Sequence, residues 1–199
     1  MKYYIVLVLI FFVSCSKKAE KKDIIEEEKI EEVVIYKEKV LPSIVLEKRQ
    51  LLGGKLSVDL PKGFDLMSKE MLASKYPANN RPTLVYTNEN GSVNFGFNHT
   101  QNKLPKNRLK DYLPAFVKQF GGIYPSIEWF DKKVKKLDNR DFIVLEFITP
   151  AIDSKIYNLM HITVLDGKML MCTFNCTESQ KAEWETKAKE SLNSIVIKE

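Results

Sequence analysis

The sequence predicts an α+β fold, a three-layer α/β/α sandwich with a largely antiparallel central sheet built from hairpins. Three observations carry this prediction. Short segments rich in apolar and β-branched residues are joined by tight-turn dipeptides such as Asp166-Gly167, which is typical of antiparallel hairpins. Two longer segments repeat apolar residues at helical spacing. Several strands are apolar on both faces, so the sheet needs a cover on each side.

The first part of the globular body is predicted to hold two hairpins with a helix between them. Strands are expected over 44–52, 55–60, 83–88 and 92–100. The Gly53-Gly54 and Asn90-Gly91 dipeptides supply the turns. The helix covers 68–75, with Ser68 as its N-cap.

A second helix is predicted from one apolar stripe, which consists of Leu109, Tyr112, Leu113, Phe116, Val117 and Phe120. Pro114 lacks a backbone donor, so it either kinks this helix or marks its first turn. Gly121-Gly122 is expected to end the helix.

The second half of the body is predicted to contain two more hairpins. Strands over 126–136 and 141–150 turn at Asp138-Asn139, and the second of them is apolar on both faces, which favours a central place in the sheet. The hairpin over 156–176 has a two-residue loop that fixes its register, so His161 faces Cys172 and Tyr157 faces Cys176.

The last helix begins at a capping box formed by Thr177-Glu178-Ser179-Gln180. One face of this helix then repeats Trp184, Ala188, Leu192 and Ile195. This helix is predicted to cover one face of the sheet, and the earlier one the other.

The N-terminus has the pattern of an export signal. Lys2 precedes an apolar run over 3–13, which is far shorter than the roughly 20 residues that span a bilayer. Val13-Ser14-Cys15 then resembles the lipobox of bacterial lipoproteins, which implies that the Cys15 thiol is lipidated and that the chain is cleaved before it. A plain secretory peptide or a short buried helix are the alternatives.

The chain therefore divides into a lipoprotein signal peptide over 1–14, a lipidated cysteine with a charged tether over 15–43, and one globular domain over 44–199. The expected location is the bacterial cell envelope, with acylated Cys15 anchored in the lipid bilayer. Ser16 follows the cysteine, which by the sorting rule of enteric lipoproteins favours the outer membrane. The tether mixes lysine and glutamate, as in a solvated helix, and its apolar spacing is too short for a coiled coil.

Three phrases in the globular part carry a second resemblance: "KLSVDLPKGFDLMSKEMLASKYP", "RPTLVYTNENGSVNFGFNHT" and "NLMHITVLDGKMLMCTFNCTESQKAEWETKAKESLNSI". With the order of elements, they are similar to the PsbP-like/DcrB-like superfamily over about residues 48 to 197. Its members include a photosystem II extrinsic subunit, a Ran-binding nuclear factor and envelope lipoproteins. The resemblance implies a non-enzymatic protein-binding or complex-supporting role, with no catalytic residue to transfer and no cofactor.

Composition argues against a nucleic-acid partner. The net charge is +5, and the lysines that crowd the strand over 126–136 lack interleaved aromatic residues or a known binding module. They are better explained as protection of a sheet edge.

The candidates for catalysis or metal binding are few. Cys172 and Cys176 lie four apart on one strand, about 13 Å between Cα atoms, which is beyond disulfide reach. We expect them to be buried and inert. The alternative is that His161 and Cys172 activate a thiolate, or bind a metal with Glu146. His99, the second histidine, lies in a separate hairpin, and the sequence has no HxxxH or CxxC spacing that would support such a site. No catalytic or metal site is predicted.

The predicted binding surface is one polar strand face. Asn94, Asn98 and Thr100 alternate with aromatic residues, and their amides and hydroxyl offer donors and acceptors to a ligand. Tyr76, Arg81 and Tyr157 are further candidates for the same surface. A solvated sheet face is the alternative explanation. The favoured function is a membrane-anchored accessory module with an envelope protein partner, and the alternative is a small-ligand binding module.

Overall fold

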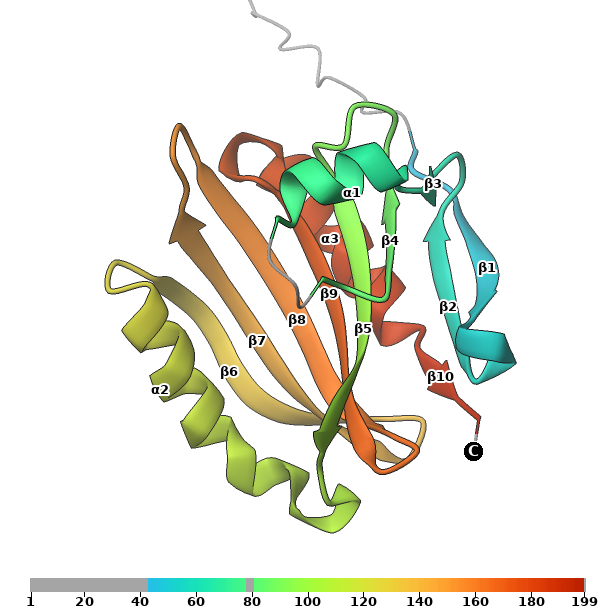
Figure 1. Cartoon of the computed structure of the whole chain (residues 1–199), viewed down its shortest axis with the longest axis vertical. Coiled ribbons are helices and arrows are strands. Elements are labelled where there is room, and N and C mark those ends of the chain that lie inside the picture. The colour runs from blue at the N-terminus through green and yellow to red at the C-terminus, as the bar shows by residue number, and fades with distance from the viewer. Residues whose placement is uncertain (1–42, 78–80, 199) are drawn as a thin grey trace, which may run out of the picture. The chain divides into compact units, whose positions relative to one another are not determined.

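The computed structural model describes residues 43–77 and 81–198 (Figure 1). The predicted signal peptide, the lipidation site Cys15 and the charged tether up to residue 42 lie outside the described residues.

The main sheet has seven antiparallel strands in the order β3-β4-β5-β9-β8-β7-β6. Their bounds are Asp65–Leu66 (β3), Leu84–Thr87 (β4), Asn94–Lys103 (β5), Lys168–Thr177 (β9), Lys155–Leu165 (β8), Arg140–Pro150 (β7) and Glu128–Leu137 (β6). The register predicted for the hairpin over 156–176 is confirmed, with His161 opposite Cys172 and Tyr157 opposite Cys176. Asp166 and Gly167 have φ values of 51° and 71°, as a two-residue type I′ turn requires.

A second sheet of three strands was not predicted. It joins β1 (Leu46–Leu51), β2 (Leu56–Pro61) and β10 (Val196–Ile197), so the first hairpin leaves the main sheet and pairs with the C-terminal segment. Two hydrogen bonds fix β2 beside the last helix: Asp59 N donates to Ser194 Oγ (2.7 Å), and Ser191 Oγ donates to Asp59 O (2.6 Å). The turn is also longer than predicted, because a short 3₁₀ helix, η1 (Leu52–Gly54), separates the two strands.

Most helix signals are confirmed. Helix α1 (Lys69–Lys75) begins at Ser68, whose Oγ accepts a hydrogen bond from Met71 N (3.1 Å). The predicted capping box at Thr177 is present, and it opens the short η3 (Glu178–Gln180) that leads into α3 (Lys181–Asn193).

The predicted second helix is two elements, a 3₁₀ helix η2 (Lys106–Tyr112) followed by α2 (Leu113–Ile123). Pro114 lies in the first turn of α2, one of the two places predicted for it. The predicted stop at Gly121-Gly122 is wrong, because α2 continues to Ile123. Neither glycine adopts the positive φ that ends a helix.

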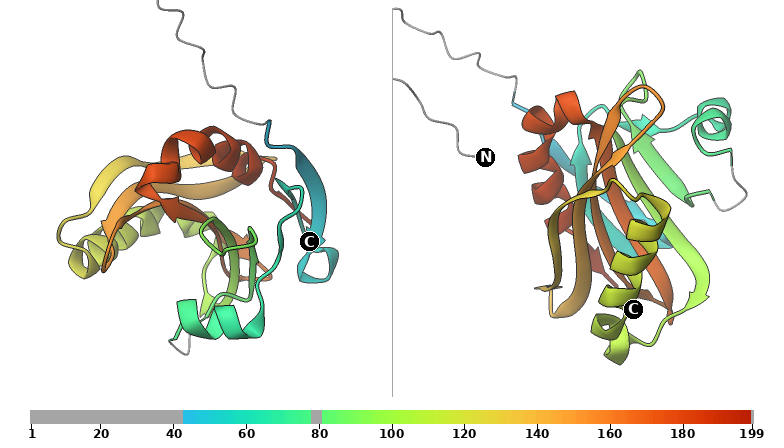
Figure 2. Two further views of the ribbon diagram at one scale, coloured as in Figure 1. Left: turned by 90° about the horizontal axis from the view of Figure 1, so that it is seen from above. Right: turned by 90° about the vertical axis from the view of Figure 1, so that its left-hand side faces the viewer.

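The two cores lie on opposite faces of the main sheet, which confirms the sandwich (Figure 2). The left view of Figure 2 shows a curved sheet, with α3 over its convex face and α2 along its concave face. Phe174, Trp184 and Ala188 belong to the core beneath α3, together with the inner side of the small sheet. Leu109, Ile143 and Ile162 belong to the core beneath η2 and α2. Within the described ranges, none of the helices has the length and apolar character needed to cross a bilayer.

Candidate functional site

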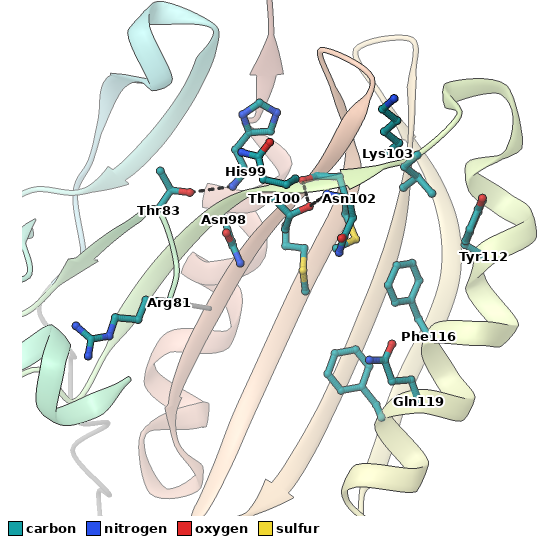
Figure 3. Close-up of a pocket in the computed structure, with 15 residues that line it drawn as sticks. Arg81, Thr83, Asn98, His99, Thr100, Asn102, Lys103, Tyr112, Phe116 and Gln119 are labelled. Carbon is teal, nitrogen blue, oxygen red and sulfur yellow. Dashed lines mark hydrogen bonds between the residues drawn. The ribbon is translucent and has the colours of Figure 1, made fainter. Parts of the chain in front are cut away.

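A groove runs along the concave face of the sheet, between β5 and α2, and encloses about 770 Å³ (Figure 3). We call it the β5–α2 groove and define it by Asn98, Thr100, Phe116, Phe120, Met169 and Met171. Methionines of β9 and phenylalanines of α2 supply apolar lining, and β5 supplies most of the polar lining, which Arg81, Thr83 and Gln119 extend.

The alternation of β5 creates the polar wall. Phe95 and Phe97 are fully buried in the core beneath α3, so the intervening Gly96 and the following Asn98 face the other side of the sheet. A Cβ atom on Gly96 would lie 2.7 Å from Thr173 Oγ1 of β9. Glycine at position 96 therefore leaves room for the Thr173 side chain of the neighbouring strand.

A second, smaller cavity of about 240 Å³ lies beside the groove, and we call it the inner cavity. The two share Asn98, Phe120 and Met171. The remaining side chains of the inner cavity are largely apolar or aromatic, and Tyr76 closes it from the segment after α1. Burial raises the pKa of Tyr76 above its usual value, while a hydrogen bond with the Asn175 side chain partly opposes that rise, so the phenol is neutral at physiological pH.

Four of the residues predicted for a binding surface come together here. Asn98, Thr100 and Arg81 line the groove, and Tyr76 lines the inner cavity. Asn94 belongs to the same strand face but lines neither space. It is 4% exposed, and its amide donates to Asn175 Oδ1 (3.0 Å) and to the Gly91 carbonyl (3.1 Å). Asn94 therefore supports Asn175, which does line the inner cavity.

Tyr157 does not share this surface, and the prediction that it does is corrected. It is fully buried on the opposite face, beneath α3, where its hydroxyl donates to Glu146 Oε1 (2.9 Å). Lys189 Nζ also contacts Glu146 Oε1 (2.9 Å). Desolvation and the neighbouring carboxylate raise the pKa of Tyr157 far above its usual value. The Tyr157 hydroxyl is a hydrogen-bond donor to a buried carboxylate and does not face the groove.

The α2 side of the groove was missed by sequence reasoning. The apolar periodicity places Phe116 and Phe120 in the stripe of a helix, and no sequence pattern points to Met169 or Met171 as binding residues. In the structure all four are only half-buried and line the groove. The available signal was Gln119, an exposed polar residue between the two phenylalanines, which lines the same groove (Figure 3).

The His161–Cys172 pair is buried beneath α3. Cys172 is fully buried, and both Cys172 and Cys176 are free thiols, as predicted. Burial raises the pKa of Cys172 strongly and that of Cys176 to about 12, so neither is a thiolate at neutral pH. Glu146, the third candidate ligand, is engaged by Tyr157 and Lys189. Among the described side chains, no group of three or more histidines, cysteines or carboxylates is placed to hold a metal.

His161 predicts a specific pH dependence of stability. Burial, assisted by Lys135, lowers its pKa from 6.5 to about 4, although its ring also hydrogen-bonds the backbone of Leu192. Between these two values the unfolded chain binds more protons, so the free energy of unfolding falls as pH is lowered from 6.5 towards 4, by about 3 kcal/mol at completion.

Urea unfolding at pH 7 and pH 4.5 measures this loss, with His161→Gln as the comparison. The wild-type protein is expected to lose about 2 kcal/mol more than the variant over that interval, because the two chains share every other titrating group. Equal losses would show that His161 is not the responsible group.

Comparisons with known proteins identify the fold. CyanoP, the cyanobacterial PsbP of Synechocystis sp. PCC 6803, superposes with a TM-score of 0.56 at 12% identity, over 80% of this chain and 96% of that one. LpqN of Mycobacterium tuberculosis gives 0.50 at 9% identity, over 77% of this chain and 92% of LpqN.

A protein of Bacteroides thetaiotaomicron gives a TM-score of 0.50 at 13% identity, over 76% of this chain and 48% of that protein, so this chain spans about half its length. No protein-family model matches the sequence, and no curated protein matches it. The chain therefore shares the PsbP-like fold of these structures, as the sequence resemblance implied.

Proposed function

We propose that this chain is a non-enzymatic lipoprotein of the bacterial envelope, anchored through acylated Cys15, and that it binds a partner through the β5–α2 groove. The groove is the observation that carries the proposal, because its volume of about 770 Å³ combines apolar side chains of α2 and β9 with polar side chains that come mainly from β5. The envelope location rests on the lipobox pattern at Cys15. It agrees with the description of LpqN, a protein of similar fold, as involved in cell envelope biogenesis.

An envelope protein is the favoured partner. Asn98 and Thr100 offer hydrogen-bond donors and acceptors that suit a polypeptide backbone. Phe116 and Met171 offer an apolar surface on which the side chains of the partner can pack. The opposite face of the sheet has no comparable role, because α3 and the small sheet cover it. The accessory role therefore uses the concave face.

Affinity capture of the acylated protein, expressed at its native level in its own envelope, tests this role. Asn98→Phe places a ring at the junction of the groove and the inner cavity, whereas the control Asn107→Phe places the same ring on exposed η2, outside both spaces. A stoichiometric partner is expected with wild type and Asn107→Phe, and its yield is expected to fall at least tenfold with Asn98→Phe. A partner retained equally by both variants would contradict binding in the groove.

A small-ligand binding module is the second candidate. Ligand pockets commonly enclose about 300–1,000 Å³, and the groove lies within this range. A ligand of this kind stabilises the folded state by mass action, so a thermal-shift screen distinguishes it from a protein partner. Stabilisation that Asn98→Phe abolishes and Asn107→Phe preserves would favour this candidate.

A further inference from the structure

The charged side chains that line the groove are all basic. The chain contains 26 acidic residues, yet among the described residues that line the groove or the inner cavity none is an aspartate or a glutamate. Arg81 and Lys103 both line the groove, and within 43–77 and 81–198 neither forms an ion pair. Figure 3 shows them towards opposite sides of Asn98 and Asn102. The groove therefore favours an anionic group over a cationic one.

The inner cavity has a different character. No charged side chain of the described residues lines it, and its walls combine the apolar Phe120, Phe147, Met160 and Met171 with the uncharged polar Thr149, Asn158, Thr173 and Asn175. Methionine side chains adapt to irregular apolar shapes and recur at permissive binding surfaces. A space of about 240 Å³ with such walls suits a slender apolar group, not a charged one.

The groove and the inner cavity lie next to each other. Asn98, Phe120 and Met171 line both, and Pro82 of the inner cavity directly follows Arg81 of the groove. A molecule bound at Asn98 can thus place an apolar portion in the inner cavity while a polar end stays in the groove, whose lining includes Arg81 and Lys103.

From this arrangement we infer that the groove and the inner cavity bind a single-chain anionic amphiphile. Its apolar chain lies in the inner cavity, and its carboxylate or phosphate lies in the groove, where Arg81 and Lys103 supply positive charge and Asn98 a hydrogen bond. This inference rests on the second candidate function, the small-ligand binding module, and names the chemical class of that ligand. A free fatty acid and a single-chain phospholipid share this chemistry.

Photolabelling of the full acylated protein in phosphatidylcholine nanodiscs tests the inference. The probes are dodecanoic acid, dodecyl phosphate and dodecanol, each with a diazirine near the end of the chain. We expect adducts on inner-cavity residues such as Phe120, Met160 and Met171. Their yield is expected to be about fivefold higher for an anionic probe than for the alcohol, because a ratio of this size corresponds to the contribution of one exposed charge pair. A higher yield with the acid or with the phosphate identifies the preferred headgroup.

A charge variant checks the role of the cations. Arg81→Gln with Lys103→Gln is expected to reduce anionic labelling about fivefold, to the level of the alcohol, while the control Lys48→Gln, on an exposed part of β1, leaves it unchanged. Equal labelling by acid and alcohol, or adducts confined to residues outside the two spaces, would overturn the inference. If the anionic probes fail while Asn98→Phe still abolishes partner capture, the ligand class is wrong and the binding role stands; if Asn98→Phe has no effect on either, both are wrong.

Discussion

Replacing Cys15 with alanine is expected to abolish lipid attachment and to move the protein from the membrane to the soluble fraction. Each buried methylene of an acyl chain contributes about 0.8 kcal/mol, so two or more chains anchor a protein durably. The apolar run over 3–13 is too short to replace them as a spanning segment. Metabolic labelling with an alkyne fatty acid and membrane fractionation after a carbonate wash measure the two effects.

Cys176→Ala provides the matched control for this experiment. This variant also removes one cysteine, whose thiol is free and buried beneath α3. We expect this variant to keep the wild-type label and membrane fraction. Fatty-acid label retained by Cys15→Ala, or lost equally from Cys176→Ala, would contradict lipidation at Cys15.

Truncation of Phe174 is expected to cause the largest loss of stability. Its ring is fully buried and contacts the rings of Phe95, Tyr157 and Trp184, with centroids 5.0, 6.1 and 6.3 Å away. It therefore joins β5, β8 and α3 in one cluster. Removing such a side chain typically costs about 3–5 kcal/mol, a large part of the roughly 5–15 kcal/mol that stabilises a domain.

Urea unfolding of Phe174→Ala beside Phe130→Ala measures this cost. Phe130 is 52% exposed and makes an edge contact with Tyr157 and a cation–π contact with Lys181 (4.7 Å), so its loss is expected to cost at most about 1 kcal/mol. Similar midpoints for the two variants would mean that the cluster around Phe174 does not hold α3 to the sheet.

Local turn chemistry explains why so much of the fold could be predicted. Asp138, Asn139, Asp166 and Gly167 all adopt the positive φ that two-residue hairpin loops require, and such loops fix the register of every residue in the hairpin. The capping groups Ser68 and Thr177 are equally local signals. Each of these features depends on residues close in sequence.

The missed features depend on contacts between distant segments. The small sheet forms because β10, at the end of the chain, pairs with β2 near its beginning. The place of Tyr157 depends on the pairing of β5 with β9, which sets Phe97 opposite Cys172. Tyr157 pairs with Cys176 and therefore shares the face of Cys172 and Phe97, whereas the asparagines of β5 lie on the other face. The groove arises where α2 only partly covers that face. Apart from Gln119 on α2, no short sequence pattern points to these placements.

The central claim is that the β5–α2 groove holds a partner in the living envelope. Site-specific photo-crosslinking in cells tests it most directly, with Phe116→benzoylphenylalanine in the groove and Phe130→benzoylphenylalanine, exposed on β6, as the matched position outside it. An adduct of discrete mass, protein or lipid, is expected from position 116 and none from position 130. No adduct from position 116, or the same adduct from both positions, would contradict it.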